Sequence, residues 1–361
     1  MFLEKLYLSN FKNYEENNFL FSSQVNCIVG ENGSGKTNLL DAVYFLALSK
    51  SAFHNQDALA IRHEENFMMI DGSFRKNKKK YQITCTIQRG QRKILMHDKK
   101  PYERIADHIG QFPVVLLAPD DTDLIREGSE ERRRFFDGVL SQIDSSYLAD
   151  YQQFNRILDQ RNGLLKIFFE RNYLDEDLLE TYNEPFLALN QKIFEQRKTF
   201  MEKFIPVFKK HYKNLSEGRE DVEIIYESEV GNEEFTKDFR RNRQRDVQSQ
   251  RTNKGVHKDD FVFEIDNFAV KKFGSQGQQK SFVMALKLAQ FEILEEIREV
   301  KPILLLDDIF DKLDDRRIEK LIQLIDNQTF SQVFITDARP ERTKKILENV
   351  KVEVRYFEIK K

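Results

Sequence analysis

The spacing of hydrophobic and polar residues changes twice along this chain. Up to about residue 118, short apolar runs alternate with turns, and the pattern predicts strands at 3–8, 18–21, 25–29, 81–88 and 93–97. A helix is predicted directly after Val29, because apolar residues recur there at helical spacing: Leu39, Leu40, Val43, Tyr44, Leu46 and Ala47. The amino-terminal third therefore predicts an α/β lobe with a strand-rich flank.

From Gly128 to about Leu215 the period becomes helical. One apolar stripe runs through Phe135, Phe136, Val139, Leu140, Ile143, Tyr147, Tyr151, Phe154, Ile157 and Leu158, and another through Leu179, Tyr182, Phe186, Leu189, Ile193, Phe200, Phe204 and Phe208. We expect two long helices packed as a hairpin, with the aromatic residues serving as core and not as a stacking platform for bases. The segment 238–255 is polar and rich in glutamine and arginine, which predicts a mobile surface connection.

After Asp259 the alternation of strands and helices returns. The pattern predicts strands at 261–265, 303–306 and 332–336, and helices at 276–297 and 318–325. We therefore predict an α/β fold with a mixed sheet, in which 1–118 and 256–361 form one discontinuous head lobe, and 119–255 is an inserted, mainly helical domain with a polar connection.

A phosphate-binding loop follows the predicted strand 25–29. The pattern G-x-x-x-x-G-K-[ST] is matched by Gly30-Glu31-Asn32-Gly33-Ser34-Gly35-Lys36-Thr37, with Asn38 next in the predicted helix. The glycines let successive backbone N–H groups face phosphates, and the helix adds the positive end of its dipole. Lys36 is expected to reach the β- and γ-phosphates, and the Thr37 hydroxyl to ligate Mg²⁺. This segment predicts a site for a nucleoside triphosphate such as ATP.

A second acidic motif ends the apolar run 303–306. Asp307 and Asp308 follow it directly, as expected for a buried parallel strand that delivers carboxylates to the sheet's carboxyl edge. Alone, such a strand end is weak support for function. Together with the phosphate-binding loop, it predicts that Asp307 holds the Mg²⁺ shell and that Asp308 accepts a proton from the attacking water.

Composition limits the classes of protein that fit. With 361 residues, 33% charged and 40% hydrophobic, the chain is expected to be a globular, cytoplasmic protein of about two domains, without a membrane span or a secretory signal. Cys27 and Cys85 fall in predicted strands and are expected to be reduced core thiols. The net charge of −2 requires any nucleic-acid contact to come from local patches. One candidate cluster is Arg240, Arg241, Arg243 and Arg245, with a solvated loop as the alternative; the lysine-rich stretch 75–80 is expected to be a solvated hairpin turn.

Two further segments resemble motifs of ABC-type ATPases. Phe273-Gly274-Ser275-Gln276-Gly277-Gln278-Gln279-Lys280 is similar to the signature motif, and 306–314 is similar to the Walker B and D-loop run, which Asp314 closes. The resemblance implies that Ser275, Gly277, Gln278 and the helix amino terminus bind the γ-phosphate held by a second subunit, so that ATP joins a homodimer. Taken alone, Ser275 also fits an ordinary helix N-cap.

Within that superfamily, the chain resembles the RecF family of bacterial recombination and repair proteins over essentially its whole length. The runs that carry the resemblance are 8–14, 118–121, 128–137 and 255–260, of which Arg-Arg-x-Phe-x-Asp at 132–137 and His-Lys-Asp-Asp at 257–260 are the most specific. The resemblance implies an SMC-like head, an ATP-dependent dimer with slow ATP hydrolysis, and binding to gapped, single-stranded or junction DNA. It also implies a RecR partner and a role in loading a recombinase.

The chain departs from the wider superfamily at several positions. Asp308 stands where most ABC-type ATPases carry glutamate, the strand ending in Thr336-Asp337 is not followed by a switch histidine, and a Q-loop glutamine is not evident near 118–120. Val256 replaces a proline expected in RecF-like sequences. The alternatives are a transporter ATPase subunit, which the helical insert and missing histidine disfavour, and a nuclease head, for which 309–361 is too short a remainder. An SMC-type arm would need a longer heptad pattern than the chain carries.

Overall fold

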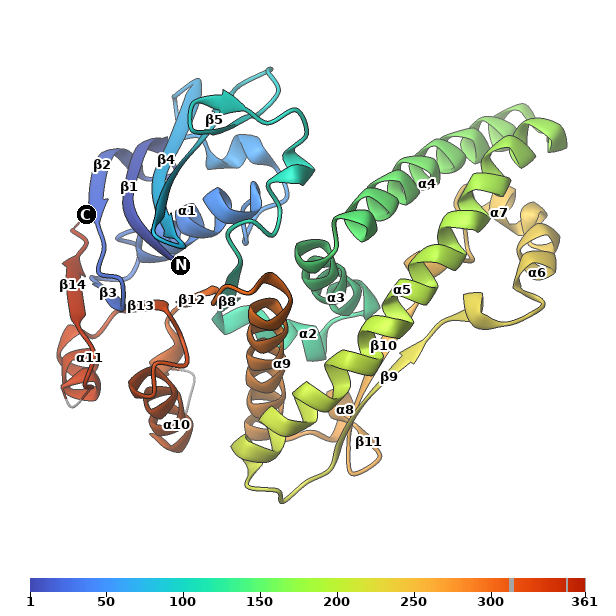
Figure 1. Ribbon diagram of the computed structural model, residues 1–361. Coiled ribbons are helices and arrows are strands. Elements are labelled where there is room, and N and C mark those ends of the chain that lie inside the picture. Colours follow the sequence, from blue (N-terminus) through green and yellow to red (C-terminus); the bar gives the residue numbers. More distant parts are fainter. Residues whose placement is uncertain (312–314, 349, 361) are drawn as a thin grey trace. The chain divides into compact units, whose positions relative to one another are not determined.

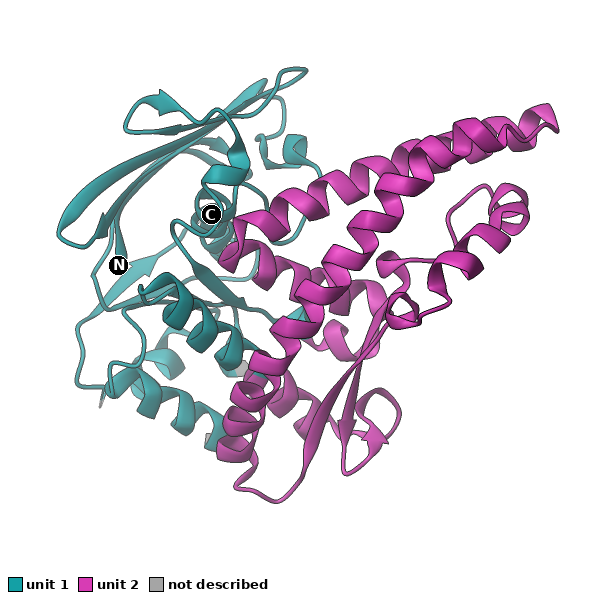
Figure 2. Ribbon diagram, turned by 45° about the vertical axis from the view of Figure 1, so that its right-hand side comes forward, with its two compact units in different colours: residues 1–121, 286–361 teal, residues 122–285 magenta. Residues whose placement is uncertain are grey.

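The computed structural model describes residues 1–311, 315–348 and 350–360 (Figure 1). They divide into two compact units, of which the first combines Met1–Asp121 with Leu286–Lys361 and the second is Thr122–Ala285 (Figure 2). In the first unit, the two ends of the chain come together in one five-stranded sheet. No helix in the described ranges is both long and apolar enough to cross a membrane.

The five-stranded sheet is parallel throughout and forms the base of the first unit. Its order is β14 (Val354–Glu358), β3 (Val25–Val29), β13 (Gln332–Asp337), β12 (Ile303–Leu306) and β8 (Val114–Leu117). The three central strands are buried along their whole length, which explains their continuous apolar sequence. Helix α1 (Lys36–Leu48) packs on β8 and β13, and α9 (Gln276–Arg298), α10 (Asp315–Asp326) and α11 (Pro340–Leu347) are the other long helices of this region.

A second sheet in the same unit is antiparallel. Its order is β2 (Tyr14–Leu20), β1 (Phe2–Phe11), β4 (Phe67–Lys76), β5 (Lys79–Gln88), β6 (Ile94–His97) and β7 (Lys100–Pro101). Side chains of both sheets and of α1 share one core, in which Leu6, Phe45 and Leu305 are almost completely buried. Strands of both orientations are thus present in this unit, in separate sheets.

Two smaller predictions about this unit are confirmed. The basic stretch is the exposed turn of the β4–β5 hairpin, where Asn77 and Lys78 take the left-handed conformation with φ of 51° and 63°. Cys27 and Cys85 are free and buried, and burial raises the pKa of each thiol to about 12, so both stay protonated.

The second unit is built on a helical hairpin of α4 (Ser145–Arg171) and α5 (Glu176–Ser216), as the sequence predicts. The stripe expected to run unbroken from Phe135 is divided at Asp144, which ends α3 (Ser129–Ile143) and caps α4 by accepting from the N–H groups of Ser146 and Tyr147. The aromatic side chains are core: the rings of Phe154 and Phe186 stack with centroids 5.0 Å apart, and both are buried. Short helices α2 (Asp123–Arg126) and α8 (Val270–Phe273) complete the helical part.

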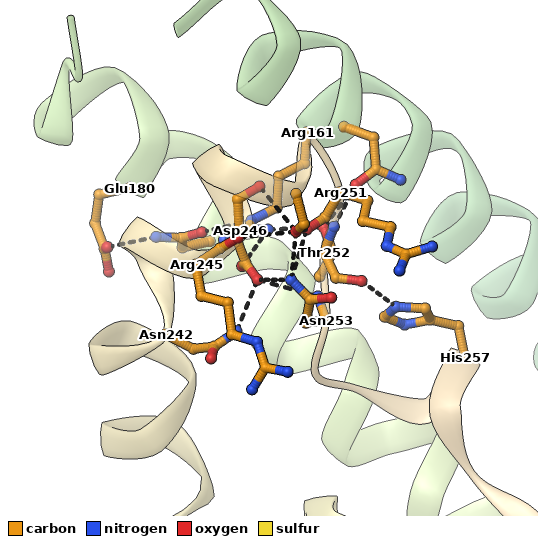
Figure 3. Close-up of polar contacts among 12 residues, drawn as sticks. Arg161, Glu180, Asn242, Arg245, Asp246, Arg251, Thr252, Asn253 and His257 are labelled. Atoms are coloured by element: carbon orange, nitrogen blue, oxygen red, sulfur yellow. Dashed lines mark hydrogen bonds and ion pairs between the residues drawn. The ribbon is translucent and has the colours of Figure 1, made fainter. Parts of the chain in front are cut away.

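The predicted mobile connection at 238–255 is wrong. This segment carries most of α6 (Phe235–Arg241) and all of α7 (Arg243–Ser249), and α7 is anchored by an ion pair of 2.9 Å between Asp246 and Arg161, both fully buried (Figure 3). The polar composition of 238–255 favoured a mobile connection, because the residue that holds α7 in place, Asp246, is itself charged. A buried aspartate paired with an arginine leaves no apolar periodicity in the sequence.

The second unit also holds a three-stranded antiparallel sheet, in the order β11 (Phe268–Ala269), β10 (Asp260–Ile265) and β9 (Val222–Glu227). Because β10 pairs with β9 along its length, with Phe263 opposite Ile224, the segment after residue 256 belongs to this unit. The units divide inside α9, between Ala285 and Leu286, and not at the 255/256 boundary expected from the sequence. Short 3₁₀ turns lie at Asp57–Ala60, Ile105–Asp107, Pro119–Thr122, Glu229–Gly231, Val256–Lys258 and Ile309–Asp311.

Candidate nucleotide-binding site

The loop 30–35 joins β3 to α1 in a conformation that needs glycine. Gly33 and Gly35 have φ of 79° and 110°, which side chains rarely tolerate. At Gly35, a Cβ would also lie 2.3 Å from Nδ2 of Asn13. Gly30 is restricted in another way, because its Cβ would lie 2.4 Å from the carbonyl oxygen of Ile359. The glycines therefore set both the curl of the loop and its close packing.

Asn13 and Tyr14, at the turn between β1 and β2, hold this loop from the side. Asn13 Nδ2 donates to the Ser34 carbonyl at 3.0 Å and its Oδ1 accepts from Asn38 Nδ2 at 2.7 Å. The Tyr14 hydroxyl donates to the Gly35 carbonyl at 3.0 Å. The sequence does not predict this role. Both residues lie in the run 8–14 that carries the family resemblance, but an asparagine and a tyrosine beside a strand turn do not by themselves indicate a contact with the phosphate-binding loop.

Lys36, the first residue of α1, folds back over the loop. Its Nζ donates to the carbonyl oxygens of Gly30 and Glu31, at 3.0 Å each, and the residue is only 4% exposed. Glu31, Asn32 and Ser34 are the three residues of the loop 30–35 that are not glycine. The ammonium group and the amino terminus of a 13-residue helix therefore face one small region, which suits the binding of phosphate groups.

The acidic motif meets the phosphate-binding loop at the carboxyl edge of the parallel sheet. Thr37 Oγ1 lies 3.0 and 3.1 Å from the two carboxylate oxygens of Asp307, and Thr336 Oγ1 donates to Asp307 Oδ1 at 2.7 Å. Burial raises the pKa of Asp307 above its ordinary value, and the hydrogen bonds from Thr336 and Thr37 oppose that rise. The structure thus brings together Lys36, Thr37 and Asp307, which are far apart in the sequence.

A hydroxyl and one carboxylate form a donor set that suits Mg²⁺. This ion prefers oxygen ligands and commonly takes one or two from protein, the rest coming from phosphates and water. Within the described ranges, no group of three or more His, Cys, Asp or Glu side chains gathers in a way that could hold a metal ion, so an all-protein cage is not found there. Thr37 and Asp307 fit a metal that is bound together with its nucleotide.

Thr336 is a functional candidate that sequence reasoning missed. It ends β13 beside Asp307 and Asp308, and its Oγ1 accepts the backbone N–H of Asp308 at 2.9 Å while donating to Asp307. Asp308 itself takes φ of 43°, a conformation uncommon outside glycine and asparagine. The sequence analysis mentions Thr336 only because no switch histidine follows the strand that it ends. A threonine at the end of a buried strand was the available signal.

A cavity of about 710 Å³ opens beside the loop. It is lined by Lys12, Asn13, Asn38, His54, Leu59, Arg62, His63, Glu64 and Glu65. Asn13 and Asn38 also belong to the hydrogen-bonded support of the phosphate-binding loop, so the cavity begins where that loop ends. Its lining combines basic side chains, amides, two carboxylates and one apolar side chain, which suits a polar group with several hydrogen-bonding atoms attached to the phosphates.

The signature-like residues lie in the second unit, at the start of α9. Ser275 N–H donates to Gln278 Oε1 at 2.7 Å, and Gln278 N–H donates to Ser275 Oγ at 3.2 Å, which is a reciprocal capping arrangement. Gly277 sits between them in the first turn. The N-cap interpretation of Ser275 is confirmed, and it leaves the nucleotide role open as a prediction. Asp314, expected to close the D-loop, lies outside the described residues.

The parallel sheet, the phosphate-binding loop and the acidic strand end define an ATPase head of the ABC and SMC class. The family model of the RecF/RecN/SMC N-terminal domain matches residues 2–360. The chain is 46% identical over 359 residues to the DNA replication and repair protein RecF of Flavobacterium johnsoniae, covering 99% of this chain and all of the relative. This chain belongs to the RecF family.

Solved structures agree with this assignment. The recombination mediator protein RecF-ATPrS of the RecFOR pathway superimposes with a TM-score of 0.89 at 28% identity, covering 99% of this chain and 96% of that one. The Smc head domain of Pyrococcus furiosus, bound to part of ScpA, has a TM-score of 0.56 at 19% identity over 99% of this chain and 94% of that one, and supports the fold alone.

Proposed function

We propose that the chain is an ATP-dependent DNA-binding protein of recombinational DNA repair. In this proposal, ATP drives formation of a homodimer on gapped or junction DNA, slow hydrolysis resets it, and the dimer helps a recombinase to load. The observation that carries the proposal is the meeting of Thr37 with Asp307 beneath a phosphate-binding loop, in a chain of the RecF family.

The nucleotide would lie along the loop 30–38. Backbone N–H groups of Gly33 to Gly35 and the Lys36 ammonium would contact the phosphates, and the adjoining cavity with Lys12 and Asn38 would take the base and sugar. Thr37 and Asp307 would hold Mg²⁺, which when bound neutralises charge on the phosphates. Support for ATP as the nucleotide comes from the RecF-ATP and RecF-ATPrS structures, which resemble this chain at TM-scores of 0.86 and 0.89.

Asp308 would act as the general base for the attacking water. It follows Asp307 directly, and the hydrogen bond from its N–H group to Thr336 fixes its backbone. An aspartate side chain is one methylene shorter than the glutamate of most ABC-type ATPases, so its reach toward the water is shorter. We therefore infer slow turnover, suited to a conformational switch.

The homodimer would bury Ser275, Gly277 and Gln278 against the nucleotide of the other copy. The reciprocal hydrogen bonds of Ser275 and Gln278 hold the amino terminus of a 23-residue helix in a defined conformation, with Ser275 exposed and Gln278 half-buried. Such a helix end favours a negatively charged ligand. Dimerisation that depends on ATP follows, because the γ-phosphate would contribute the contact between copies.

DNA and a RecR-like mediator would be the partners, and the site of action the cytoplasm. Support comes from relatives named DNA replication and repair protein RecF and from a solved RecF structure assigned to the RecFOR pathway.

The proposal is tested by measuring the mass of the purified protein in solution with and without ATP, Mg²⁺ and a gapped duplex. A monomer that becomes a dimer with ATP, and binds the gapped duplex only in that state, is the expected result. A protein that stays monomeric at saturating ATP, or that binds DNA equally without nucleotide, would contradict the proposal.

A further inference from the structure

The arginines of α6 and α7, which the sequence suggested as DNA contacts, are largely neutralised. Arg243 pairs with Glu176 at 2.9 Å, Arg241 with Asp238 at 3.6 Å, and Arg240 donates both Nε and Nη2 to Glu180. Three of the four cations therefore have a carboxylate partner within the second unit. Pairing of this kind removes much of the attraction for a phosphate backbone.

Two other cations, Arg251 and Lys258, lie on the loop that follows α7. The carbonyl oxygen of Thr252 accepts from Nε2 of His257 at 2.9 Å, which closes the loop on itself. Arg251 and Lys258 are the residues immediately outside this hydrogen bond, next to Thr252 and His257 in the chain. Both residues are exposed, and Figure 3 shows the guanidinium of Arg251 outside the network of dashed contacts.

Side chains from α4 and α5 hold this loop, and three of them, Arg161, Asn190 and Arg197, are buried. Arg161 Nη1 donates to Thr252 Oγ1 at 2.7 Å, and Asn162 Oδ1 accepts from the Thr252 N–H at 2.7 Å. On the other side, Asn190 Oδ1 accepts from the Val256 N–H at 2.7 Å and Arg197 Nη1 donates to the Val256 carbonyl at 2.8 Å. These hydrogen bonds restrain the backbone of the loop on both sides, which reduces the entropy that the two cations lose when they bind a ligand.

The charges beneath the loop balance, whereas those on it do not. Arg132 pairs with Asp260, and Arg161 with Asp246. Arg197 pairs with Asp137 and Asp259, and Arg133 donates to the backbone carbonyl oxygen of Asp259. Arg251 and Lys258 add two positive charges, and neither has an ion pair anywhere in the part of the chain that the structure describes.

The environment of Lys258 agrees with an excess of positive charge. Partial burial lowers the pKa of this lysine, Arg251 and Arg133 lower it further, and the carboxylate of Asp246 partly opposes these effects. Arg133 lies close by, because its Nη1 donates to the carbonyl oxygen of Asp259. An anion placed between these groups would relieve their mutual repulsion.

From this geometry we propose that Arg251 and Lys258 form a phosphate-binding pair on the second unit, and that its ligand is the backbone of DNA. The inference rests on the proposed DNA-binding function and gives it a location. The pair would contact backbone phosphates, and such contacts position the protein on DNA without carrying sequence information. In a chain of net charge −2, a local excess of this kind is what a polyanion requires.

The test compares two double variants that change the charge equally. Arg251→Gln with Lys258→Gln removes the proposed pair, and Arg241→Gln with Arg243→Gln removes two cations that already have carboxylate partners. Fluorescence anisotropy with two gapped duplexes of unrelated sequence, in ATP and Mg²⁺, gives the affinity over a series of salt concentrations. Thermal melting and ATP binding of both variants should match the wild type, because all four side chains lie at the surface.

In the Arg251→Gln and Lys258→Gln variant, two phosphate contacts are lost. The plot of log affinity against log salt should therefore become shallower by roughly 0.9 for each contact, for both duplex sequences alike. The Arg241 and Arg243 variant should keep the wild-type slope. If both variants keep the wild-type slope and affinity, the loop is not a DNA contact and an acidic protein surface becomes the better ligand. If the wild type itself binds neither duplex, the proposed function fails and this inference fails with it.

Discussion

Thr37 and Asp307 meet through a hydrogen bond of 3.0 Å between Oγ1 and Oδ1, although 270 residues separate them in the chain. The contact exists because β3 and β12 are parallel strands on either side of β13, so the residues after both strands reach the same edge. The fold therefore places the two oxygen ligands expected for Mg²⁺ side by side.

Thr336→Val tests whether the hydroxyl on β13 positions the acidic pair. Valine has nearly the same shape but removes a donor to Asp307 and an acceptor for the Asp308 N–H, so the free energy of unfolding should fall by about 1–3 kcal/mol. ATP hydrolysis should fall as well. Thr336→Ser keeps the hydroxyl and should restore most of the hydrolysis rate in a steady-state ATPase assay. A valine variant with the wild-type rate would remove Thr336 from the site.

Lys36→Arg should abolish nucleotide-dependent behaviour while leaving the fold intact. The ammonium group is held between two carbonyls at 3.0 Å in a nearly buried position, and a planar guanidinium is too bulky to replace it without displacing the loop. Isothermal titration with ATP should show binding lost, and circular dichroism should show unchanged helix content. Dimerisation of this variant by ATP at wild-type concentrations would contradict the role given to the lysine.

Asp308→Asn should retain ATP but slow its hydrolysis. Thr37 and Asp307 remain to hold the metal and its nucleotide, whereas the amide cannot accept the proton of the attacking water. The ATP-bound dimer should therefore accumulate, and its lifetime on a gapped duplex should lengthen. Single-turnover hydrolysis and DNA dissociation rates measure the two effects, and undiminished hydrolysis would place the base elsewhere.

The elements with strong local patterns were predictable from the sequence. The phosphate-binding loop, the acidic strand end and the helical hairpin each depend on residues close together in the chain, and the structure has all three. The ranges 67–76, 114–117, 222–227 and 354–358 were not predicted as strands, although all are strands in the structure. These strands are recognisable mainly by the partners they meet across a sheet, which a single sequence does not reveal.

Long-range polar contacts were the part that could not be predicted. The anchoring of α7 by Asp246 requires Arg161 at the same place, and the support of the phosphate-binding loop by Asn13 requires a turn 21 residues upstream of Ser34. Charged and amide side chains of this kind are typical of solvated surfaces, so their pattern favours a loop. Only the tertiary structure shows that their partners are buried beside them.

His108 should make the protein less stable in mild acid. It is buried, with Nε2 donating to the Leu46 carbonyl at 2.9 Å and Nδ1 3.2 Å from the Tyr102 hydroxyl, and burial lowers its pKa from 6.5 to about 4. Because the folded pKa lies below the unfolded one, the neutral ring stabilises the fold above pH 6.5, and this contribution is lost as the pH falls toward 4. The loss should reach about 3 kcal/mol at the acid end.

The measurement is urea unfolding of wild type, His108→Gln and His63→Gln between pH 7 and pH 4. His63 is the matched control, since its side chain is 95% exposed. The difference in stability between wild type and His108→Gln should shrink as the pH falls, while that for His63→Gln should change little, because the 3.8 Å contact of His63 with Glu64 lies at the exposed surface. A constant difference for both would mean that His108 does not titrate on unfolding.

Ser275→Arg tests whether two copies share each nucleotide site. Ser275 is exposed at the start of α9, so an arginine can be accommodated in the monomer, and ATP should still bind to the intact loop at Lys36. The added bulk and charge should block the docking of the other copy's γ-phosphate and prevent dimerisation.

Lys36→Arg alone should also be inactive, because it binds no nucleotide. A mixture of the two variants can form heterodimers in which one site has both an intact Lys36 and an intact Ser275, so partial recovery of ATPase activity is expected, with its maximum near equal amounts. If the activity of the mixture stays at the sum of the two inactive variants at every ratio, the site is complete within one chain, and the exposed helix end at Ser275 has another role.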